Sequence, residues 1–313
     1  MFLEALAQTH RVSLLIVPLH NSRTPTSDAH IARHCAEVFV VEPQVTQLGG
    51  AATQPGLVRL LAGQTKACAA AIGATTFDVI QAQRIYTAPL ALGLAHTTAS
   101  GRARLHLDLD DRESVTHARI ADLLRHNLKK AASDHEAAEA AAYTRAEQEL
   151  LPRFDRLYVC STADAEAVTA SVPGSAVRVV PNALRPPLRI PERLTTHPFR
   201  FLFVGSLNYY PNEDAVRFFC TEVVPLLRRL TDAPFQVRVV GTGLSDALMP
   251  LTRIPEVRLV GAVDDLAPEY GEADAVIVPV RAGGGTRIKV LEAFAYRRPV
   301  VSTTLGIEGI EAA

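Results

Sequence analysis

The chain has 313 residues, of which 48% are hydrophobic and 21% charged, and its formal net charge is −1. This is the composition of a globular protein, and the length is sufficient for two domains with separate cores. A net charge so close to zero argues against a protein that binds nucleic acid.

The four cysteines lie far apart and form no CxxC pair. They therefore indicate free thiols in a reducing compartment. No run of about 18 apolar residues is present to span a bilayer. The start of the chain carries Glu4 and no basic segment, unlike a signal peptide. We expect a cytoplasmic protein, with peripheral contact to the inner face of the membrane as an open alternative.

The first part of the chain alternates apolar runs with helical stretches. The run at Arg11–Leu19 is continuous, which is typical of a strand buried on both faces. The charged, Ala-rich span from about Glu113 to Leu151 predicts helix. Strands that alternate with helices predict a parallel sheet covered on both faces. Further strands are predicted at residues 37–43, 77–83, 102–110, 155–161 and 176–182.

A proline-rich segment separates this part from a second one. Prolines at 186, 187, 191 and 198 exclude a regular helix or a central strand, so we predict a linker over residues 186–198. This divides the chain into an N-terminal domain of residues 1–185 and a C-terminal domain of residues 199–313. In the second domain, strands are predicted at residues 199–206, 235–243, 257–263, 273–280 and 298–304.

Several predicted strands of the C-terminal domain end in glycine, including those that lead into Gly205, Gly241 and Gly261. In open parallel sheets, ligands bind at the carboxyl ends of the strands. A single glycine there is most often part of a tight turn, but a set at successive strand ends favours a ligand site.

Gly283, Gly284 and Gly285 follow a buried strand and precede a helix that we expect to begin at Thr286. Amides of a glycine turn at a helix N-terminus bind anions. Thr286 could cap this helix or donate its hydroxyl. The turn matches neither GxxxxGK[ST] nor the GxGxxG that follows a first strand.

Arg287 and Lys289 follow in the first turn and a half of the predicted helix. Cations there oppose the helix dipole, so a phosphate-rich ligand is the better reason for them. Glu292 comes one to two turns after the glycines, where a carboxylate could accept hydrogen bonds from the vicinal hydroxyls of a ribose.

These segments resemble the retaining GT-B glycosyltransferases of family 4, also called glycosyltransferase group 1, and most closely their bacterial exopolysaccharide branch. Residues 278–310 resemble the donor-nucleotide signature. The matching segments in the rest of the chain are residues 107–114, 154–168, 179–184, 201–219 and 257–280.

The resemblance implies two Rossmann-like, doubly wound parallel-sheet domains that face each other across a cleft. It implies transfer of a sugar from a nucleotide diphosphate-sugar to a saccharide or lipid-linked acceptor. The anomeric configuration is retained and no cofactor or metal is obligatory. The donor residues that it implies are Gly205, Ser206, Gly241, Val263, Gly283, Gly284, Gly285, Thr286, Arg287, Lys289 and Glu292.

Within this set, the resemblance implies that Gly283 to Thr286 contact the sugar and phosphates and that Glu292 holds the ribose. Gly205 and Ser206 approach a phosphate, and Val263 lies against the base. The sequence departs from the family in two places. Gly284 replaces the first glutamate of an E-x7-E pair, and the loop after residue 204 carries no cation. Arg287 or Lys289 could replace that charge at the leaving diphosphate.

In the N-terminal domain, Asp110 or Asp111 occupies the place where many relatives have a histidine near the donor sugar. Either could bind a sugar hydroxyl or accept the acceptor's proton, or could instead cap the helix that follows. Arg84 is an acceptor-side candidate. Two metal sites are disfavoured: the DLD of Asp108–Asp110, and His30 with His34 beside Cys35, which lacks further ligands.

Relatives have an additional first strand and further C-terminal helices, so the chain resembles a version shortened at both ends. Two alternatives therefore stay open beside an active glycosyltransferase. One is a remnant that binds nucleotide-sugar without turnover. The other is a nucleotide-sugar epimerase, which would need acid/base carboxylates and a histidine grouped together.

Overall fold

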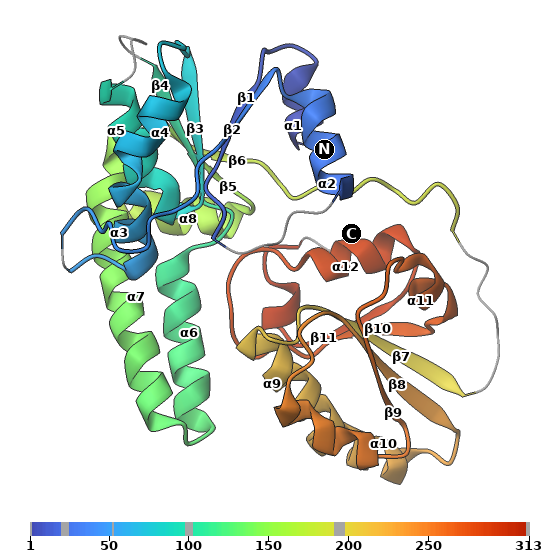
Figure 1. The fold of residues 1–313 in the computed structure, drawn as a ribbon. Coiled ribbons are helices and arrows are strands. Elements are labelled where there is room, and N and C mark those ends of the chain that lie inside the picture. Colours follow the sequence, from blue (N-terminus) through green and yellow to red (C-terminus); the bar gives the residue numbers. More distant parts are fainter. Residues whose placement is uncertain (1, 20–24, 52, 98–102, 191–197, 311–313) are drawn as a thin grey trace. The chain divides into compact units, whose positions relative to one another are not determined.

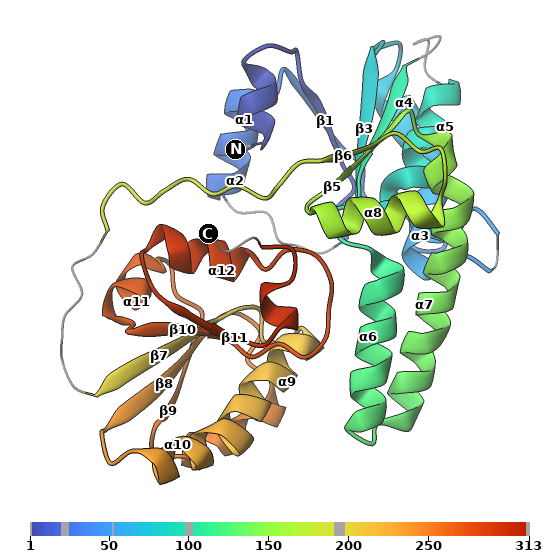
Figure 2. The ribbon, with the colours of Figure 1, turned by 180° about the vertical axis from the view of Figure 1, so that it is seen from behind.

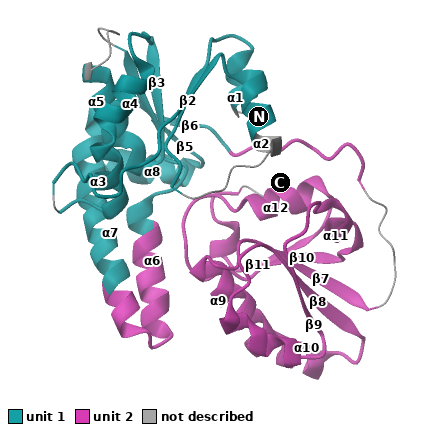
Figure 3. Ribbon diagram, viewed as in Figure 1, with its two compact units in different colours: residues 1–115, 135–181 teal, residues 116–134, 182–313 magenta. Residues whose placement is uncertain are grey.

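The protein divides into two compact units in the computed structural model, which describes residues 2–19, 25–51, 53–97, 103–190 and 198–310. Unit 1 comprises residues 1–115 and 135–181, and unit 2 comprises residues 116–134 and 182–313 (Figure 3). Part of a helical hairpin, residues 116–134, thus belongs to the second unit. No helix among the described ranges is long and apolar enough to cross a membrane.

Unit 1 contains two parallel sheets (Figure 1). The four-stranded sheet has the order β3 (Val79–Gln83), β4 (Arg104–Asp108), β5 (Arg156–Val159) and β6 (Val177–Val179). The other sheet pairs β1 (Ser13–Ile16) with β2 (Glu37–Val40). Each strand lies where an apolar run predicted one.

Helices of unit 1 connect these strands and supply the rest of its core. Apolar residues of α3, α5, α7 and α8 form one buried cluster with β3, β4 and β5, and α8 also packs on β6 (Figure 2). The helices are α1 (Phe2–Ala7), α2 (Pro25–His34), α3 (Gly56–Gly63), α4 (Thr65–Ile72), α5 (Ala88–Thr97), α7 (Lys130–Leu150) and α8 (Thr162–Ser171), with 3-10 turns at Ile85–Thr87 and Leu151–Arg153.

The expectation that the first strand is buried on both faces is wrong. All four residues of β1 are half-buried, and within the described ranges β1 pairs only with β2. An apolar cavity of about 560 Å³ separates the strand from β3, and consecutive residues of both strands line it. Because the cavity replaces a neighbouring strand, β1 lacks the contacts that would bury it.

Unit 2 has one five-stranded parallel sheet at its centre. Its order is β11 (Val300–Ser302), β10 (Ala275–Val278), β7 (Phe199–Val204), β8 (Phe235–Val240) and β9 (Val257–Gly261). All four residues of β10 are buried. The buried strand therefore fixes the position of the residue from which the glycine turn starts.

The helical elements of unit 2 are residues 116–126 of α6 (Glu113–His126), α9 (Tyr210–Phe218), a π-helical turn (Phe219–Val223), α10 (Val224–Leu230), α11 (Ala267–Glu272) and α12 (Ile288–Ala295). Two 3-10 segments span Asp246–Arg253 and Leu305–Ile307.

The predicted linker, residues 186–198, falls partly outside the described residues, which omit 191–197. Residues 182–190 form neither helix nor strand. The domain boundaries chosen from the prolines stay a prediction.

Candidate functional site

The glycine turn leaves the sheet directly after β10. Gly283 has φ +106° and Gly285 has φ +65°, a region that glycine enters without steric cost. A Cβ on Gly283 would lie 3.3 Å from the Tyr209 hydroxyl and 3.4 Å from Nη2 of Arg287. Glycine at this position thus allows a tyrosine and an arginine to approach the backbone.

The helix after the turn begins later than expected. It starts at Ile288, and Arg287 occupies the N-cap position without a side-chain cap hydrogen bond. Thr286 therefore does not cap it, because the positive φ of Gly285 and the non-helical ψ of 98° at Arg287 delay helix formation. The Thr286 hydroxyl oxygen is buried and makes no hydrogen bond within the described part of the chain.

Arg287 turns back onto the loop. Its Nη1 donates to the carbonyl oxygens of Gly284 and Gly285, the latter at 2.9 Å. The guanidinium thus holds two consecutive peptide groups of the turn. A contact between Arg287 and a diphosphate stays a prediction.

Lys289 extends from α12 to the loop after β7. Its Nζ donates to Oδ1 of Asn212 at 2.9 Å and lies 4.3 Å above the Phe203 ring. A Cβ on Gly205 would lie 2.9 Å from this Nζ. Burial, and then the positive charge of Arg287, lower the pKa of Lys289 to about 7. The ammonium therefore lies beside the loop that lacks a cation in the sequence.

The loops after β7 and β8 pack against each other. The Gly205 amide donates to the Val240 carbonyl at 3.1 Å. A Cβ on Gly241 would lie only 1.8 Å from the Gly205 carbonyl oxygen. Close backbone approach is thus a structural reason for Gly241, and its donor contact stays a prediction. Ser206 is exposed beside these glycines, and its carbonyl accepts from Asn212 Nδ2 at 2.9 Å.

Glu292 is held by a tyrosine from α11. The Tyr270 hydroxyl donates to Glu292 Oε2 at 2.8 Å, and the Tyr270 ring stacks on Tyr296 with centroids 4.6 Å apart. Burial and the neighbouring Glu292 raise the pKa of Tyr270, so its hydroxyl stays protonated as a donor. Val263, the predicted base contact, is partly buried against the unit 2 core.

The structure therefore brings together only some of the predicted donor residues. The Lys289 ammonium lies beside Gly205, and Arg287 donates to the carbonyls of Gly284 and Gly285. Sequence reasoning missed Asn212, Tyr270 and Tyr209. Asn212 contacts Lys289, which is 77 positions away in the chain, and Tyr270 contacts Glu292, which is 22 positions away. No local sequence pattern indicates contacts between residues so far apart.

In unit 1, Arg84 and Asp110 form a pair. Arg84 donates to Oδ2 of Asp110 from Nε at 3.1 Å and from Nη2 at 2.8 Å, and to Glu113 from Nη1 at 2.9 Å. Both Arg84 (φ 66°) and Asp110 (φ 55°) adopt the left-handed region, which is uncommon for residues other than glycine. α6 begins only at Glu113 and Arg84 binds the Asp110 carboxylate, so the cap interpretation of Asp110 is wrong, whereas that of Asp111 stays a prediction.

The two disfavoured metal sites can be located. Asp108 Oδ1 accepts from the Asp110 amide at 3.0 Å. The rings of His30 and His34 lie 4.7 Å apart on α2. Across the described ranges, no three His, Cys, Asp or Glu side chains gather as a metal site would require.

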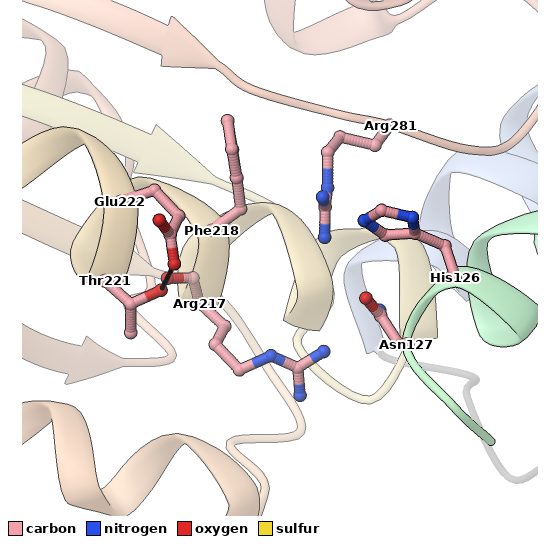
Figure 4. Close-up of a pocket in the computed structure, with 7 residues that line it drawn as sticks. All are labelled: His126, Asn127, Arg217, Phe218, Thr221, Glu222 and Arg281. Atoms are coloured by element: carbon pink, nitrogen blue, oxygen red, sulfur yellow. Dashed lines mark hydrogen bonds between the residues drawn. The ribbon is translucent and has the colours of Figure 1, made fainter.

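Another cavity, of about 370 Å³, lies in unit 2, and Arg281, two residues before Gly283, is among the residues that line it (Figure 4). Its two arginines are both paired with the fully buried Asp214. Arg281 donates to that carboxylate at 2.8 and 2.9 Å, and Arg217 at 3.1 Å. The arginine charges are thus compensated within the protein, which distinguishes this cavity from the Lys289 site. His126, Asn127, Phe218, Thr221 and Glu222 complete the lining.

Comparison with known proteins adds an independent finding. Residues 198–312 match the family described as Glycosyl transferases group 1. No curated protein sequence matches the chain. Sucrose-phosphate synthase from Thermosynechococcus elongatus is similar in structure, with a TM-score of 0.63 and 15% identity over 95% of this chain and 82% of that one. HepE from Anabaena, in a structure with UDP and glucose, is also similar, with a TM-score of 0.60 and 14% identity over 95% of this chain and 81% of that one.

At these identities the structural likeness shows the fold. The four- and five-stranded parallel sheets match those of GT-B glycosyltransferase structures. The predicted α/β class with parallel Rossmann-like sheets is confirmed.

Proposed function

We propose that this protein is a retaining glycosyltransferase whose unit 2 binds a nucleotide diphosphate-sugar. The observation that carries the proposal is the convergence of α12 on the end of β7, where the Lys289 ammonium lies at Gly205 and Asn212. A cation beside bare glycine backbone favours a diphosphate ligand. The match of residues 198–312 to the group 1 family supports the same assignment.

In this proposal Lys289 binds the diphosphate together with the backbone of Gly205 and Ser206. The turn from Gly283 to Thr286 contacts the transferred sugar and the phosphates, and the free Thr286 hydroxyl supplies one polar group. Glu292 binds the ribose, since Tyr270 engages only its Oε2. Val263 and Gly241 complete the donor contacts. A structure of HepE with UDP-glucose makes a uridine donor the first to test.

The chemistry follows from charge. As the glycosyl–phosphate bond breaks, the sugar becomes oxocarbenium-like and the leaving nucleoside diphosphate gains negative charge. Fixed amides and a cation at the diphosphate stabilise that state more than the ground state. The pKa of about 7 at Lys289 makes its charge responsive to the ligand, because a nearby diphosphate favours the protonated ammonium.

The acceptor side is assigned to unit 1. We propose that Asp110 or Asp111 contacts a sugar hydroxyl or accepts the acceptor's proton, and that Arg84 fixes the Asp110 carboxylate. A saccharide or lipid-linked acceptor, the exopolysaccharide branch and peripheral membrane contact are parts of the same proposal.

Calorimetry and thermal shift with UDP-, GDP- and ADP-sugars test the donor site, and nucleotide release with candidate acceptors tests turnover. Binding of one donor class followed by release supports a glycosyltransferase. Binding without release in any acceptor mixture would support a remnant that binds but does not turn over. Absence of binding by all three classes would refute the donor site.

A further inference from the structure

The carbonyls of the glycine turn are held by two arginines, one of which comes from a distant part of the sequence. Arg119 of α6 donates from Nη1 to the Gly283 carbonyl at 3.0 Å. Arg119 also forms a forked pair with Glu308, at 2.6 and 2.8 Å. Both partners belong to unit 2. The guanidinium is thus fixed by a carboxylate while it binds the turn.

Apolar packing places this arginine. Ile120, Leu123 and Leu124 of α6 form a buried cluster with Ala282, the residue directly before Gly283. The side chain of Asn127 just beyond α6 donates to Asp214 at 2.7 Å and to the Tyr210 hydroxyl at 2.8 Å. These contacts attach the helix to Ala282, directly before the turn, and to α9.

The three bonds to the turn orient successive peptide groups. In a planar trans peptide, the carbonyl and the following amide point in opposite directions. Arg119 binds the Gly283 carbonyl, so the Gly284 amide points away from Arg119. Arg287 binds the carbonyls of Gly284 and Gly285, so the next two amides point away from Nη1 of Arg287.

We propose that Arg119 is a positioning residue of the donor site: it fixes the Gly283–Gly284 peptide so that the Gly284 amide is presented to the phosphate or sugar, while Arg287 does the same for the two following amides. The ligand named here rests on the proposed function. Arg119 acts through the backbone of the turn and does not touch the donor.

The test compares Arg119→Met, Arg119→Lys and Glu308→Gln with the control Arg125→Met. The Arg125 side chain lies on the same helix, is 64% exposed and, among the described residues, pairs only with Asp122. The first readout needs no ligand. Backbone 15N relaxation of Gly284 in Arg119→Met is expected to show an order parameter falling from about 0.85 toward 0.6, while Arg125→Met matches wild type.

The second readout separates positioning from general loss of structure. Affinities for UDP, inorganic pyrophosphate and uridine are measured by calorimetry or NMR titration. Arg119→Met is expected to lower UDP and pyrophosphate affinity about tenfold and to leave uridine affinity unchanged. Glu308→Gln, which weakens the fork without removing Arg119, gives a smaller loss in the same direction. Arg119→Lys should lose less affinity than Arg119→Met, because the ammonium can still donate to the Gly283 carbonyl. The affinity should stay below that of wild type, because Lys lacks the forked geometry of the guanidinium.

Unchanged relaxation and affinity in Arg119→Met would overturn the proposal, as would an equal loss for uridine, UDP and pyrophosphate. If Arg119→Met does not fold, Glu308→Gln and Arg119→Lys decide by the same criteria. If wild-type protein binds none of the three probes, the proposed function fails, and the ligand-free relaxation alone decides whether Arg119 holds the turn.

Discussion

At the scale of single residues, Glu292 is the most direct test of the donor site. Tyr270 occupies one of its oxygens at 2.8 Å. If the other binds a ribose, Glu292→Ala leaves a ribose hydroxyl without its partner and weakens donor binding by about 1–3 kcal/mol. Calorimetry with the donor found in the screen measures this. Tyr270→Phe, which keeps the ring stacking on Tyr296, is the matched variant and should lose less. Equal donor affinities in wild type and Glu292→Ala would refute the ribose assignment.

Lys289 predicts a pH dependence of stability. Its folded-state pKa of about 7 is below its ordinary value of 10.5. The unfolded chain therefore binds this proton more tightly, and protonation opposes folding. The penalty is fully present below about pH 7 and disappears as the pH rises toward 10.5. Stability of the ligand-free protein should thus rise with pH in this window, by at most about 1.4 kcal/mol per pH unit from this one group.

Urea unfolding at pH 6.5 and 9 measures the effect, with Lys289→Met as the comparison. The free energy of unfolding of wild type should gain more between the two pH values than that of Lys289→Met, because only wild type carries this titrating group. Identical gains in both proteins would mean that the Lys289 ammonium is not desolvated in the folded state.

At the scale of elements, the loops after β7 and β8 depend on a glycine. In Gly241→Ala the new Cβ would meet the Gly205 backbone at 1.8 Å, which no side-chain rotation can relieve. We expect a loss of at least about 2 kcal/mol in the free energy of unfolding. Gly56→Ala, at the start of α3 with no atom within 4 Å of its Cβ, is the control and should be neutral or slightly stabilising. A Gly241→Ala protein as stable as wild type would contradict the close packing of these loops.

The sheets also differ in how firmly they are held. β1 and β2 form an isolated pair whose residues are half-buried or exposed, whereas the ends of β7 and β8 are buried in the unit 2 core. Two-stranded sheets are only marginally stable. Amides of Leu14–Ile16 should therefore exchange with solvent at least about tenfold faster than those of Leu202–Val204. Hydrogen exchange measures this, and similar protection in both would imply that β1 has a further partner.

The sequence was sufficient to predict the positions of the eleven strands found in the described part of the chain, because a buried parallel strand produces a continuous apolar run. It did not predict that β1 is separated from β3, since an apolar run does not specify its neighbours. The turn at Gly283 was identifiable because consecutive glycines are rare between a strand and a helix. The sequence did not predict the contacts that position the site residues, because these contacts depend on tertiary packing. Examples are Tyr270–Glu292, Lys289–Asn212 and Arg119–Gly283.

At the scale of the whole molecule, the two units have separate buried cores. The proposed donor-binding residues all belong to unit 2, whereas the proposed acceptor-side residues belong to unit 1. A ligand stabilises the structure that binds it by RT ln(1 + [L]/Kd), about 2.7 kcal/mol at one hundred times Kd. UDP at that excess should therefore slow hydrogen exchange in the sheet of unit 2. Core amides of β4 and β5 in unit 1 should change little, unless the units unfold together.

The control for that experiment is Glu292→Ala at the same UDP concentration, for which protection of unit 2 should fall in proportion to the lost affinity. Protection of β10 and α12 in wild type with unchanged exchange in β4 places nucleotide binding in unit 2. Protection confined to unit 1 would contradict the donor assignment while leaving the fold intact. Because β10 carries the glycine turn and α12 carries Lys289 and Glu292, the amides of these two elements should respond most strongly to the nucleotide.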